Sequence, residues 1–260
     1  MLNVPFFFSM TNPPRILIVE DSADDTEVTL LELSRGGLTP DWKRVETADE
    51  MRAALAEGPW DAVLSDFSLP GSSAAEALAL CRTTDPDLPF IVVSGIIGEE
   101  RAVDMMRAGA GDYLLKGNLT RLSAAVEREI REAGSRRARR RAEAAALLQA
   151  ALVQSSTDAI IAKTVDGVIT NWNPAAVLLF GWTPEEVVGR HISFIVPADY
   201  ADEHAAIKDR LANGERVAAL ETVRLRKDGT QVEVSLAVSP LQDSDGRLRA
   251  AGARAHLRAG

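Results

Sequence analysis

The chain has 260 residues, of which 46% are hydrophobic, and this is enough apolar material for one or two cores. No stretch approaches the roughly 18 consecutive apolar residues that a membrane span requires, and "LNVPFFFSM" lacks the basic segment of a signal peptide. The single cysteine, Cys81, excludes disulfides and cysteine metal clusters within one chain. We therefore predict a cytoplasmic protein that does not associate with membranes.

The net charge of −9 is distributed unevenly along the chain. Residues 15–134 carry 23 acidic and 12 basic side chains, a local balance of −11, which would repel nucleic acid. Residues 135–155 reverse the sign with five arginines and one glutamate, and the rest is near balance with 14 acids and 12 bases. These changes in composition predict four segments: a disordered tail at 1–14, a domain at 15–133, a helical linker at 134–155 and a second domain at 156–260.

Short apolar runs rich in β-branched residues recur in the first domain, and such runs are typical of strands buried on both faces of a sheet. They are "RILIV", "DAVLS", "PFIVVS" and "DYLLK". Between them lie helical patterns that begin on acids and end near glycine, such as "ADDTEVTLLELSRGG", "ADEMRAALAEG" and "EERAVDMMRAGA". This alternation predicts an α/β fold with a doubly wound, five-stranded parallel sheet, in which "WKRVET", the most polar strand, lies at an edge.

Polar side chains follow the predicted strands where each one ends. The first strand ends at Glu20 and Asp21, the third at Asp66, the fourth at Ser94 and the fifth at Lys116. Because the ligand crevice of a doubly wound sheet lies outside the carboxyl ends of its strands, we expect these side chains to converge there. Three carboxylates at such short distances repel one another unless a cation such as Mg²⁺ lies among them. A hydroxyl and an ammonium group beside them suit a phosphoryl group.

These residues, the "DFSLPG" turn and the "AGAGDYLLK" segment resemble the receiver domain of bacterial two-component response regulators over about residues 15–133. The resemblance implies that Asp66 is the phosphoacceptor nucleophile, and that a histidine kinase or phosphotransfer protein is the donor. It implies Mg²⁺ as the cofactor, with Glu20 and Asp21 as its ligands or as neighbours of its ligands. Asp66 itself and the backbone carbonyl of Ser68 would complete the metal site.

The resemblance also assigns the remaining strand-end residues. Ser94 would bind a phosphoryl oxygen, Lys116 would pair with the phosphate, and Tyr113 would turn inward on activation. Receivers commonly carry proline after the lysine, whereas Gly117 follows here, which predicts a looser lysine loop and slower phosphorylation or a less tightly held switch. Each residue taken singly also has a structural explanation, with Glu20 as a helix cap, Ser94 as a turn hydroxyl, Lys116 as a surface charge and Tyr113 as core.

Residues 118–155 show a helical pattern interrupted at Gly134 and Ser135. The "RRARRR" cluster in this linker has alanine-rich surroundings and no interleaved aromatic residue, which favours a solvated helix face over a nucleic-acid site. The apolar positions can pair with a second copy in a parallel coiled coil, so we expect a homodimer. These positions are Leu122, Val126, Ile130, Leu147, Leu148, Ala151 and Leu152.

After Ser155 the pattern changes to short alternating strands separated by Asp-Gly turns. The segment "VRLRKDGTQVEVSLAVSPL" predicts a hairpin, and Asn173 followed by Pro174 predicts the start of a helix at "AAVLLFGW". A longer helix is expected within "ADYADEHAAIKDRLANGE". The buried side of the hairpin is predicted to hold Val223, Leu225, Val232, Val234, Leu236 and Val238.

The segments "DAIIAKTVDGVITNWNPAAVLLFGWTPEEVVGR", "IVP" and the hairpin resemble a PAS domain over about residues 150–256. The resemblance implies an α+β domain whose antiparallel sheet carries its helices between strands two and three, and a role in sensing or dimerisation with an unknown ligand. Within "EHAAIKDR", His204 and Arg210 match the helix that carries the proximal histidine of haem sensors, although the distal arginine position falls near Leu220. A surface or capping histidine is the alternative. Cys81 lies in the wrong domain for a flavin photosensor.

Together these patterns predict a response regulator of a two-component phosphorelay. Asp66 would accept a phosphoryl group, and the linker helix would relay the change to the PAS domain. Such a protein is a phosphorylated switch rather than a turnover enzyme. Two alternatives stay open: the front part of a hybrid histidine kinase or cyclase, because no catalytic module is visible before "GARAHLRAG", and a PAS ligand sensor that acts independently of phosphorylation.

Overall fold

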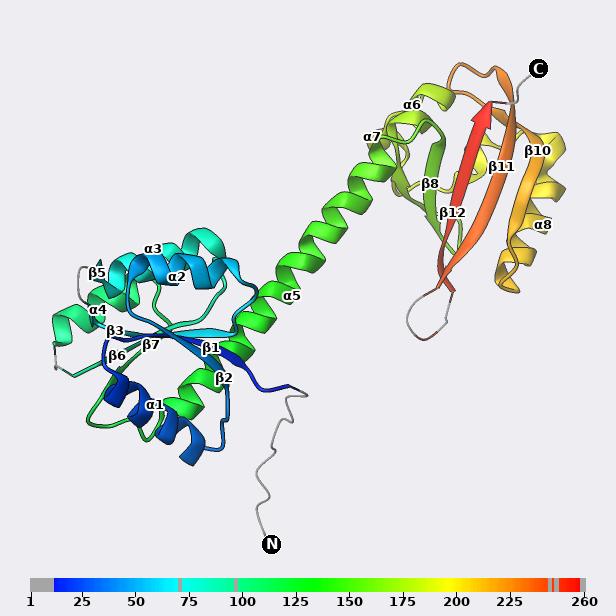
Figure 1. The fold of residues 1–260 in the computed structure, drawn as a ribbon. Helices are drawn as coiled ribbons and strands as arrows, with labels where there is room; N and C mark the ends of the chain where they lie inside the picture. Colours follow the sequence, from blue (N-terminus) through cyan, green and yellow to red (C-terminus); the bar gives the residue numbers. More distant parts are fainter. Residues whose placement is uncertain (1–11, 70–71, 96–97, 243–244, 246–247, 258–260) are drawn as a thin grey trace, which may run out of the picture. The chain divides into compact units, whose positions relative to one another are not determined.

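The computed structural model describes residues 12–69, 72–95, 98–242, 245 and 248–257 (Figure 1). The chain divides into two compact units, with the boundary between Ala142 and Glu143. The predicted tail lies outside the described residues up to residue 11, as do Gly71 of the "DFSLPG" turn and Gly246 of the last Asp-Gly turn. Among the described helices, none combines the length and apolar character needed to cross a bilayer.

The first unit is built on a five-stranded parallel sheet in the order β2-β1-β3-β6-β7, which confirms the predicted doubly wound architecture. The polar strand β2 lies at an edge, as expected. The chain leaves β1 to one side for β2 and returns to the other side for β3, so the switch point lies between β1 and β3. The strands are β1 (Arg15–Val19), β2 (Asp41–Val45), β3 (Ala62–Asp66), β6 (Phe90–Ser94) and β7 (Asp112–Leu115).

Helices cover both faces of this sheet (Figure 1). On one face, Leu17 of β1 packs in a cluster with residues of α2 and α3, whereas on the other Ile16 packs with residues of α1 and α5. Both side chains are fully buried, which explains why the strand reads as a continuous apolar run. The helices are α1 (Ala23–Arg35), α2 (Ala48–Ala56), α3 (Ala74–Thr84), α4 (Glu99–Arg107) and α5 (Leu122–Gln154).

A small hairpin that was not predicted follows Asp66. The two-residue strands β4 (Ser68–Leu69) and β5 (Ser72–Ser73) pair antiparallel. Ser73 then caps α3, because its hydroxyl accepts a hydrogen bond from the Glu76 amide at 3.3 Å and its own amide donates to the Glu76 carboxylate at 3.1 Å. Local hydrogen bonds therefore fix the segment that leaves Asp66.

Helix α5 is continuous from Leu122 to Gln154, so the predicted interruption at Gly134 and Ser135 is wrong. The Ser135 hydroxyl donates to the Arg131 carbonyl at 3.1 Å, one turn back, so this side chain is satisfied without leaving the helix. A glycine inside a helix costs about 1 kcal/mol relative to alanine. That cost is small enough to be offset by the ion pairs that follow immediately along α5.

The "RRARRR" cluster is largely exposed, as expected for a solvated helix face, but three of its arginines also pair with the loop between α3 and β6. Arg137 lies 2.6 Å from Asp85, and Arg136 and Arg140 lie 3.5 and 3.4 Å from the buried Asp87. Burial alone would raise the pKa of Asp85, but hydrogen bonds from the Asp87 amide and Arg137 hold that pKa below its ordinary value. These charges tie α5 to the first unit.

The second unit contains a five-stranded antiparallel sheet in the order β10-β11-β12-β8-β9. The helices α6 (Pro174–Phe180), α7 (Pro184–Val187) and α8 (Ala201–Ala212) lie between the second and third strands along the chain, which confirms the predicted arrangement. Short 3₁₀ helices at Ile192–Ile195 and Ala198–Tyr200 precede α8. The strands are β8 (Ala159–Thr164), β9 (Ile169–Trp172), β10 (Val217–Leu225), β11 (Gln231–Gln242) and β12 (Leu248–Leu257).

The predicted inner face of the hairpin is correct for β11 and wrong for β10. In the part of β10 next to the turn, the buried side chains are Thr222 and Arg224, at 5% and 4% exposure, while Val223 and Leu225 are only half-buried. Thr222 pairs with Val234 and Arg224 with Val232, and directly opposite residues share a face of the sheet. The register of the hairpin places Thr222 and Arg224 on the inner face of the sheet. There, Glu203 of α8 pairs with Arg224.

Asn173 joins the end of α5 to the sheet of the second unit. Its fully buried side chain makes four hydrogen bonds. The carbonyl oxygen accepts from the amides of Ile160 at 2.8 Å and Ala176 at 2.9 Å, and the amide nitrogen donates to the carbonyls of Val153 at 3.1 Å and Asp158 at 3.0 Å. The side chain therefore satisfies backbone groups of α5, the connection to β8, β8 itself and α6.

Replacing Asn173 with alanine is expected to lower the unfolding free energy of the second unit by about 2 kcal/mol or more, because buried backbone groups lose their partners. Urea unfolding of the full chain measures this change. Asn171→Ala, at an exposed position in β9, is the matched control and should change stability little. Equal losses in the two variants would show that the buried network contributes nothing specific.

Candidate functional site

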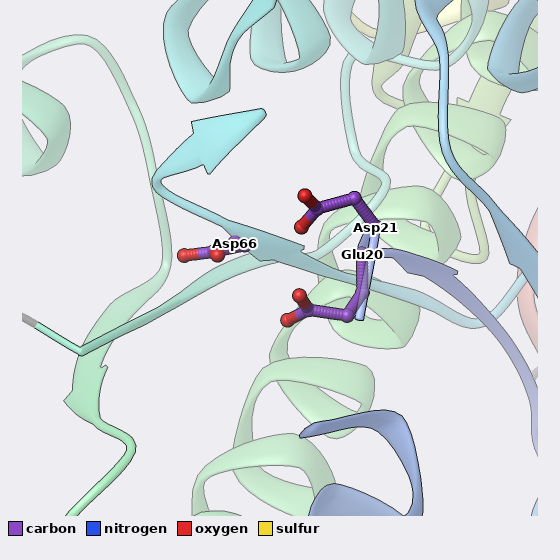
Figure 2. A group of neighbouring side chains, drawn as sticks. All are labelled: Glu20, Asp21 and Asp66. Atoms are coloured by element: carbon purple, nitrogen blue, oxygen red, sulfur yellow. The ribbon is translucent and has the colours of Figure 1, made fainter. Parts of the chain in front are cut away.

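Three carboxylates meet at the switch point of the parallel sheet. Glu20 and Asp21 follow β1 and Asp66 ends β3, so neighbouring strands deliver them to the same edge (Figure 2). One oxygen from each carboxylate lies within 4.8 Å of the others. Glu20 is buried, Asp66 is half-buried and Asp21 is exposed, so the cluster runs from the interior to solvent. This arrangement fits a Mg²⁺ site, because hard divalent cations prefer oxygen ligands.

Glu20 is the carboxylate most affected by its surroundings. Burial raises its pKa above the ordinary value, and the negative charge of Asp66 acts in the same direction. Hydrogen bonds from Lys116 at 2.8 Å and from the Ser22 amide at 3.2 Å oppose this rise. A cation bound among the acids would relieve the remaining repulsion, so the electrostatics of the pocket favour positive charge.

Lys116, directly after β7, reaches back to this cluster. Its ammonium group lies 2.8 Å from Glu20, 3.0 Å from Asp66 and 2.5 Å from Asp25. Burial alone would lower its pKa, but hydrogen bonds with these three carboxylates hold the pKa above its ordinary value. The Lys116 ammonium group therefore stays positively charged, and it lies beside Asp66, the predicted site of the phosphoryl group.

Asp25 is the residue of this site that the sequence analysis missed. From the sequence, Asp25 is one of the acids on which a helical pattern begins. In agreement with this, its amide donates a hydrogen bond to the hydroxyl of the capping residue Ser22 at 3.2 Å. Its carboxylate, however, contacts Lys116. No local signal marks this contact, because Asp25 and Lys116 are 91 residues apart in the sequence.

The two oxygens of Asp66 have different partners. Oδ1 accepts hydrogen bonds from the amides of Phe67 at 2.6 Å and Ser68 at 3.4 Å, while Oδ2 faces Lys116. The backbone after the strand therefore orients the carboxylate, and the opposite oxygen is held by the cation. Ser68 itself is exposed beside the pocket.

Ser94 lies on β6, which is next to β3, and Tyr113 lies on β7, the strand beyond β6. Ser94 is buried at the end of β6, and the amide of Lys116 donates to its carbonyl at 2.8 Å. Tyr113 is half-buried on β7 and packs against the apolar cluster on the α2 and α3 face. The roles predicted for Ser68, Ser94 and Tyr113 concern the phosphorylated protein and stay predictions.

In the second unit, His204 of α8 lines a cavity together with Lys163 and Arg224. Burial lowers the pKa of His204 to about 4, and the positive charges of Lys163 and Arg224 add to this effect. Arg210, which the sequence placed beside His204 in a shared motif, pairs instead with Glu215 at 3.1 Å. The cavity has a volume of about 40 Å³, far below the roughly 300–1,000 Å³ of cofactor pockets. The haem prediction for His204 gains no support from this geometry and stays a prediction.

Comparison with protein families gives one match in each unit. Residues 16–127 match the response regulator receiver domain, and residues 148–257 match the PAS fold. The two matches together span most of the chain, and residues 128–147, which separate them, lie within α5.

Among curated relatives, the response regulator protein FleR of Pseudomonas aeruginosa is 34% identical over 102 residues, which cover 39% of this chain and 21% of FleR. The transcriptional regulatory protein PrrA of Mycobacterium tuberculosis is 32% identical over 126 residues, covering 47% of this chain and 52% of PrrA. The chain thus spans about a fifth to a half of the length of these relatives.

Among solved structures, an RNA-binding light-oxygen-voltage receptor matches with a TM-score of 0.40 and 24% identity, over 42% of this chain and 32% of the receptor. The PAS domain of a protein from Colwellia psychrerythraea matches with a TM-score of 0.40 and 20% identity, over 43% of this chain and 94% of that domain.

Mg²⁺ is expected to raise the thermal unfolding midpoint of the full chain, because a divalent cation relieves the repulsion among Glu20, Asp21 and Asp66. Asp21→Asn should weaken the apparent Mg²⁺ affinity about tenfold or more while leaving the fold intact, since Asp21 is exposed. Asp24→Asn, at an exposed position in the first turn of α1, is the control and should keep the wild-type response. An Asp21→Asn protein that responds to Mg²⁺ like wild type would contradict the site.

Proposed function

The chain joins a response regulator receiver domain at residues 16–127 to a PAS domain at residues 148–257, and from this we propose that it is a phosphorylation switch of a two-component system. A histidine kinase or phosphotransfer protein donates a phosphoryl group to Asp66 in the cytoplasm. The observation that carries this proposal is the convergence of Asp66 and Lys116 with the acidic pair Glu20 and Asp21 at one edge of the sheet.

The geometry supports an in-line transfer. A carboxylate oxygen of Asp66 forms a bond to phosphorus while the bond between phosphorus and the donor's histidine nitrogen breaks, and the electron pair stays with the imidazole. Glu20, Asp21 and Asp66 would hold Mg²⁺, which would neutralise negative charge on the transferred oxygens. Lys116, already 3.0 Å from Asp66, moves its hydrogen bond to a phosphoryl oxygen. Water later hydrolyses the acyl phosphate, so the protein acts as a switch rather than a turnover enzyme.

The change at Asp66 is proposed to spread through Ser94 on β6, the strand next to β3, and then to Tyr113 on β7, the strand beyond it. The Ser94 hydroxyl moves toward the phosphoryl group, and Tyr113 turns into the space that this movement leaves. A surface pocket of about 260 Å³ beside Tyr113, lined by Ala102 of α4 and Asn118 after β7, leaves room for such rearrangement. The face formed by α4 and β7 is therefore the surface that reports phosphorylation.

Helix α5 is the proposed relay to the PAS domain. Its first half is tied to the receiver domain by Arg136, Arg137 and Arg140, and its last turn is held by the hydrogen bond between Asn173 and the Val153 carbonyl. The helix runs without a break between these two attachments. A displacement at one attachment is thus transmitted along a stiff element rather than lost in a flexible linker.

The C-terminal half of α5 also supports a homodimer. Leu147, Leu148 and Leu152 are 73%, 62% and 62% exposed, and they repeat at a spacing that places them along one side of the helix. Exposed leucines in a helix otherwise rich in alanine and charge are favourable when a second helix covers them. We therefore propose that two copies pair along this segment in a parallel coiled coil.

Phosphorylation is expected to require Asp66. With labelled acetyl phosphate and Mg²⁺, the wild-type protein should take up an alkali-labile phosphoryl group, and Asp66→Asn should take up only background label, because the nucleophilic carboxylate is absent. Asp24→Asn serves as the control that keeps labelling. Persistent labelling of Asp66→Asn would overturn the assignment, and unlabelled wild-type protein would favour the alternative of a phosphorylation-independent PAS sensor.

Dimerisation is expected to depend on the leucines of α5. Light scattering should give twice the chain mass for wild type and the single-chain mass for Leu148→Glu, because a charge replaces an apolar contact. Leu178→Glu, at a position in α6 that is 86% exposed, is the matched control and should stay dimeric. A strict monomer with and without an acyl-phosphate mimic would exclude the coiled coil.

A further inference from the structure

The Lys116 ammonium group has as many carboxylate partners as it has N–H donors. A lysine carries three donors, and the nitrogen lies 2.8 Å from Glu20, 3.0 Å from Asp66 and 2.5 Å from Asp25. A further acceptor, such as a phosphoryl oxygen, therefore replaces one of these contacts. Which contact is kept decides where Lys116 lies during phosphoryl transfer.

The three partners of Lys116 differ in their relation to the metal site. Glu20 and Asp66 belong, with Asp21, to the group whose carboxylate oxygens lie within 4.8 Å of one another. In the part of the chain that the structure describes, Asp25 is not a member of such a group. A divalent cation in the pocket would draw on the same carboxylates that now accept from Lys116, and it would repel the ammonium group. Asp25 is the partner of Lys116 that lies outside this competition.

The first turn of α1 fixes Asp25 beside Lys116. Ser22 caps the helix, and its hydroxyl accepts a hydrogen bond from the Asp25 amide at 3.2 Å. The hydroxyl of the buried residue Thr26 donates to the Ser22 carbonyl at 2.9 Å and closes the same turn. A carboxylate at a helix N-terminus also interacts favourably with the partial positive charge there. The backbone thus holds Asp25 on the side of the pocket that Lys116 reaches.

Asp25 is also the outermost of the three acids. Its side chain is 43% exposed, whereas those of Asp66 and Glu20 are 13% and 6% exposed. The ammonium group therefore lies between two interior carboxylates and one at the solvent side. Because of this position, Asp25 can be replaced without disturbing the apolar core.

We propose that Asp25 is a positioning residue for phosphoryl transfer, because it keeps the Lys116 ammonium group in the pocket when Mg²⁺ is bound. The N–H donors released by Glu20 and Asp66 then turn to phosphoryl oxygens, while the third donor stays with Asp25. A metal ion and an ammonium group can in this way occupy one acidic pocket without competing for the same carboxylates. This inference rests on the proposed function and deepens it, because it gives a role to an acid outside the metal group.

The first test measures Mg²⁺ binding without a phosphoryl donor, from the shift of the thermal unfolding midpoint with Mg²⁺ concentration. Asp25→Asn is expected to weaken the apparent Mg²⁺ affinity about threefold to tenfold, because Lys116 then competes with the metal for Glu20 and Asp66. In a Lys116→Met background the same substitution should change the affinity much less, since no ammonium group is left to position. Equal losses in the two backgrounds would mean that Asp25 acts only through its charge, which would overturn the proposal.

A second measurement follows the ammonium group itself. In protein labelled with ¹⁵N-lysine, the Lys116 resonance is assigned by its absence from Lys116→Arg. It should stay visible in wild type when Mg²⁺ is added, because a hydrogen-bonded ammonium group exchanges slowly with water. It should disappear on adding Mg²⁺ to Asp25→Asn and remain in Asp25→Glu. Loss of the wild-type resonance with Mg²⁺, or its persistence in Asp25→Asn, would overturn the proposal even if Lys116→Met were too unstable to study.

Labelling with acetyl phosphate at saturating Mg²⁺ tests the role in the reaction. Asp25→Asn should be labelled about threefold to tenfold more slowly than wild type, because Lys116 is no longer held beside the phosphoryl oxygens. Asp25→Glu should recover most of the rate. Asp24→Asn, which removes an exposed acid from the same first turn of α1, is the control and should be labelled at the wild-type rate. Unchanged or faster labelling of Asp25→Asn would contradict the positioning role.

These outcomes are separable from failure of the proposed function. If wild-type protein takes up no label, the phosphorylation switch fails, but the Mg²⁺ titrations and the lysine resonances still decide whether Asp25 holds Lys116. If wild type is labelled and Asp25→Asn behaves like it in all three measurements, the switch stands and the role of Asp25 is excluded.

Discussion

Several negative charges lie at one edge of the sheet in the first unit, and the fold there depends on their compensation. Lys116 compensates them, because its ammonium group lies within hydrogen-bond distance of Glu20, Asp25 and Asp66. These contacts join β7 to β1, α1 and β3, which are distant along the chain. The same arrangement leaves the cluster with more negative than positive charge. The edge is therefore held together by a cation and still favours another, which is the condition for a metal-assisted phosphoryl transfer.

Ion pairs also attach the linker helix α5 to the first unit. The loop acids Asp85 and Asp87 pair with arginines of α5, so this largely exposed segment is also tied to the first unit. At the other end, the hydrogen bonds of Asn173 include a carbonyl of the last turn of α5. One continuous helix is therefore attached to folded structure at both of its ends.

Both units compensate an inward-facing cation with acids of their own chain. Lys116 is surrounded by three carboxylates in the first unit, and Arg224 is paired with Glu203 in the second. In each case the acids come from elements other than the one that carries the cation, so these pairs form only when the elements pack together.

The sequence alone determined the order of strands and helices, the parallel and antiparallel sheets, and the acids at the ends of β1 and β3, because these follow from local apolar periodicity and from where each apolar run stops. Tertiary structure decided what a polar residue does when its partner is distant. Asp25 joins the site only because Lys116 reaches it. Thr222 and Arg224 face inward because Glu203 of α8 accepts a hydrogen bond from Thr222 and pairs with Arg224. Helix α5 continues through Gly134, and ion pairs with the first unit follow directly along it. Local patterns carry no information about such partners, since the energy of burying a polar group depends on what meets it there.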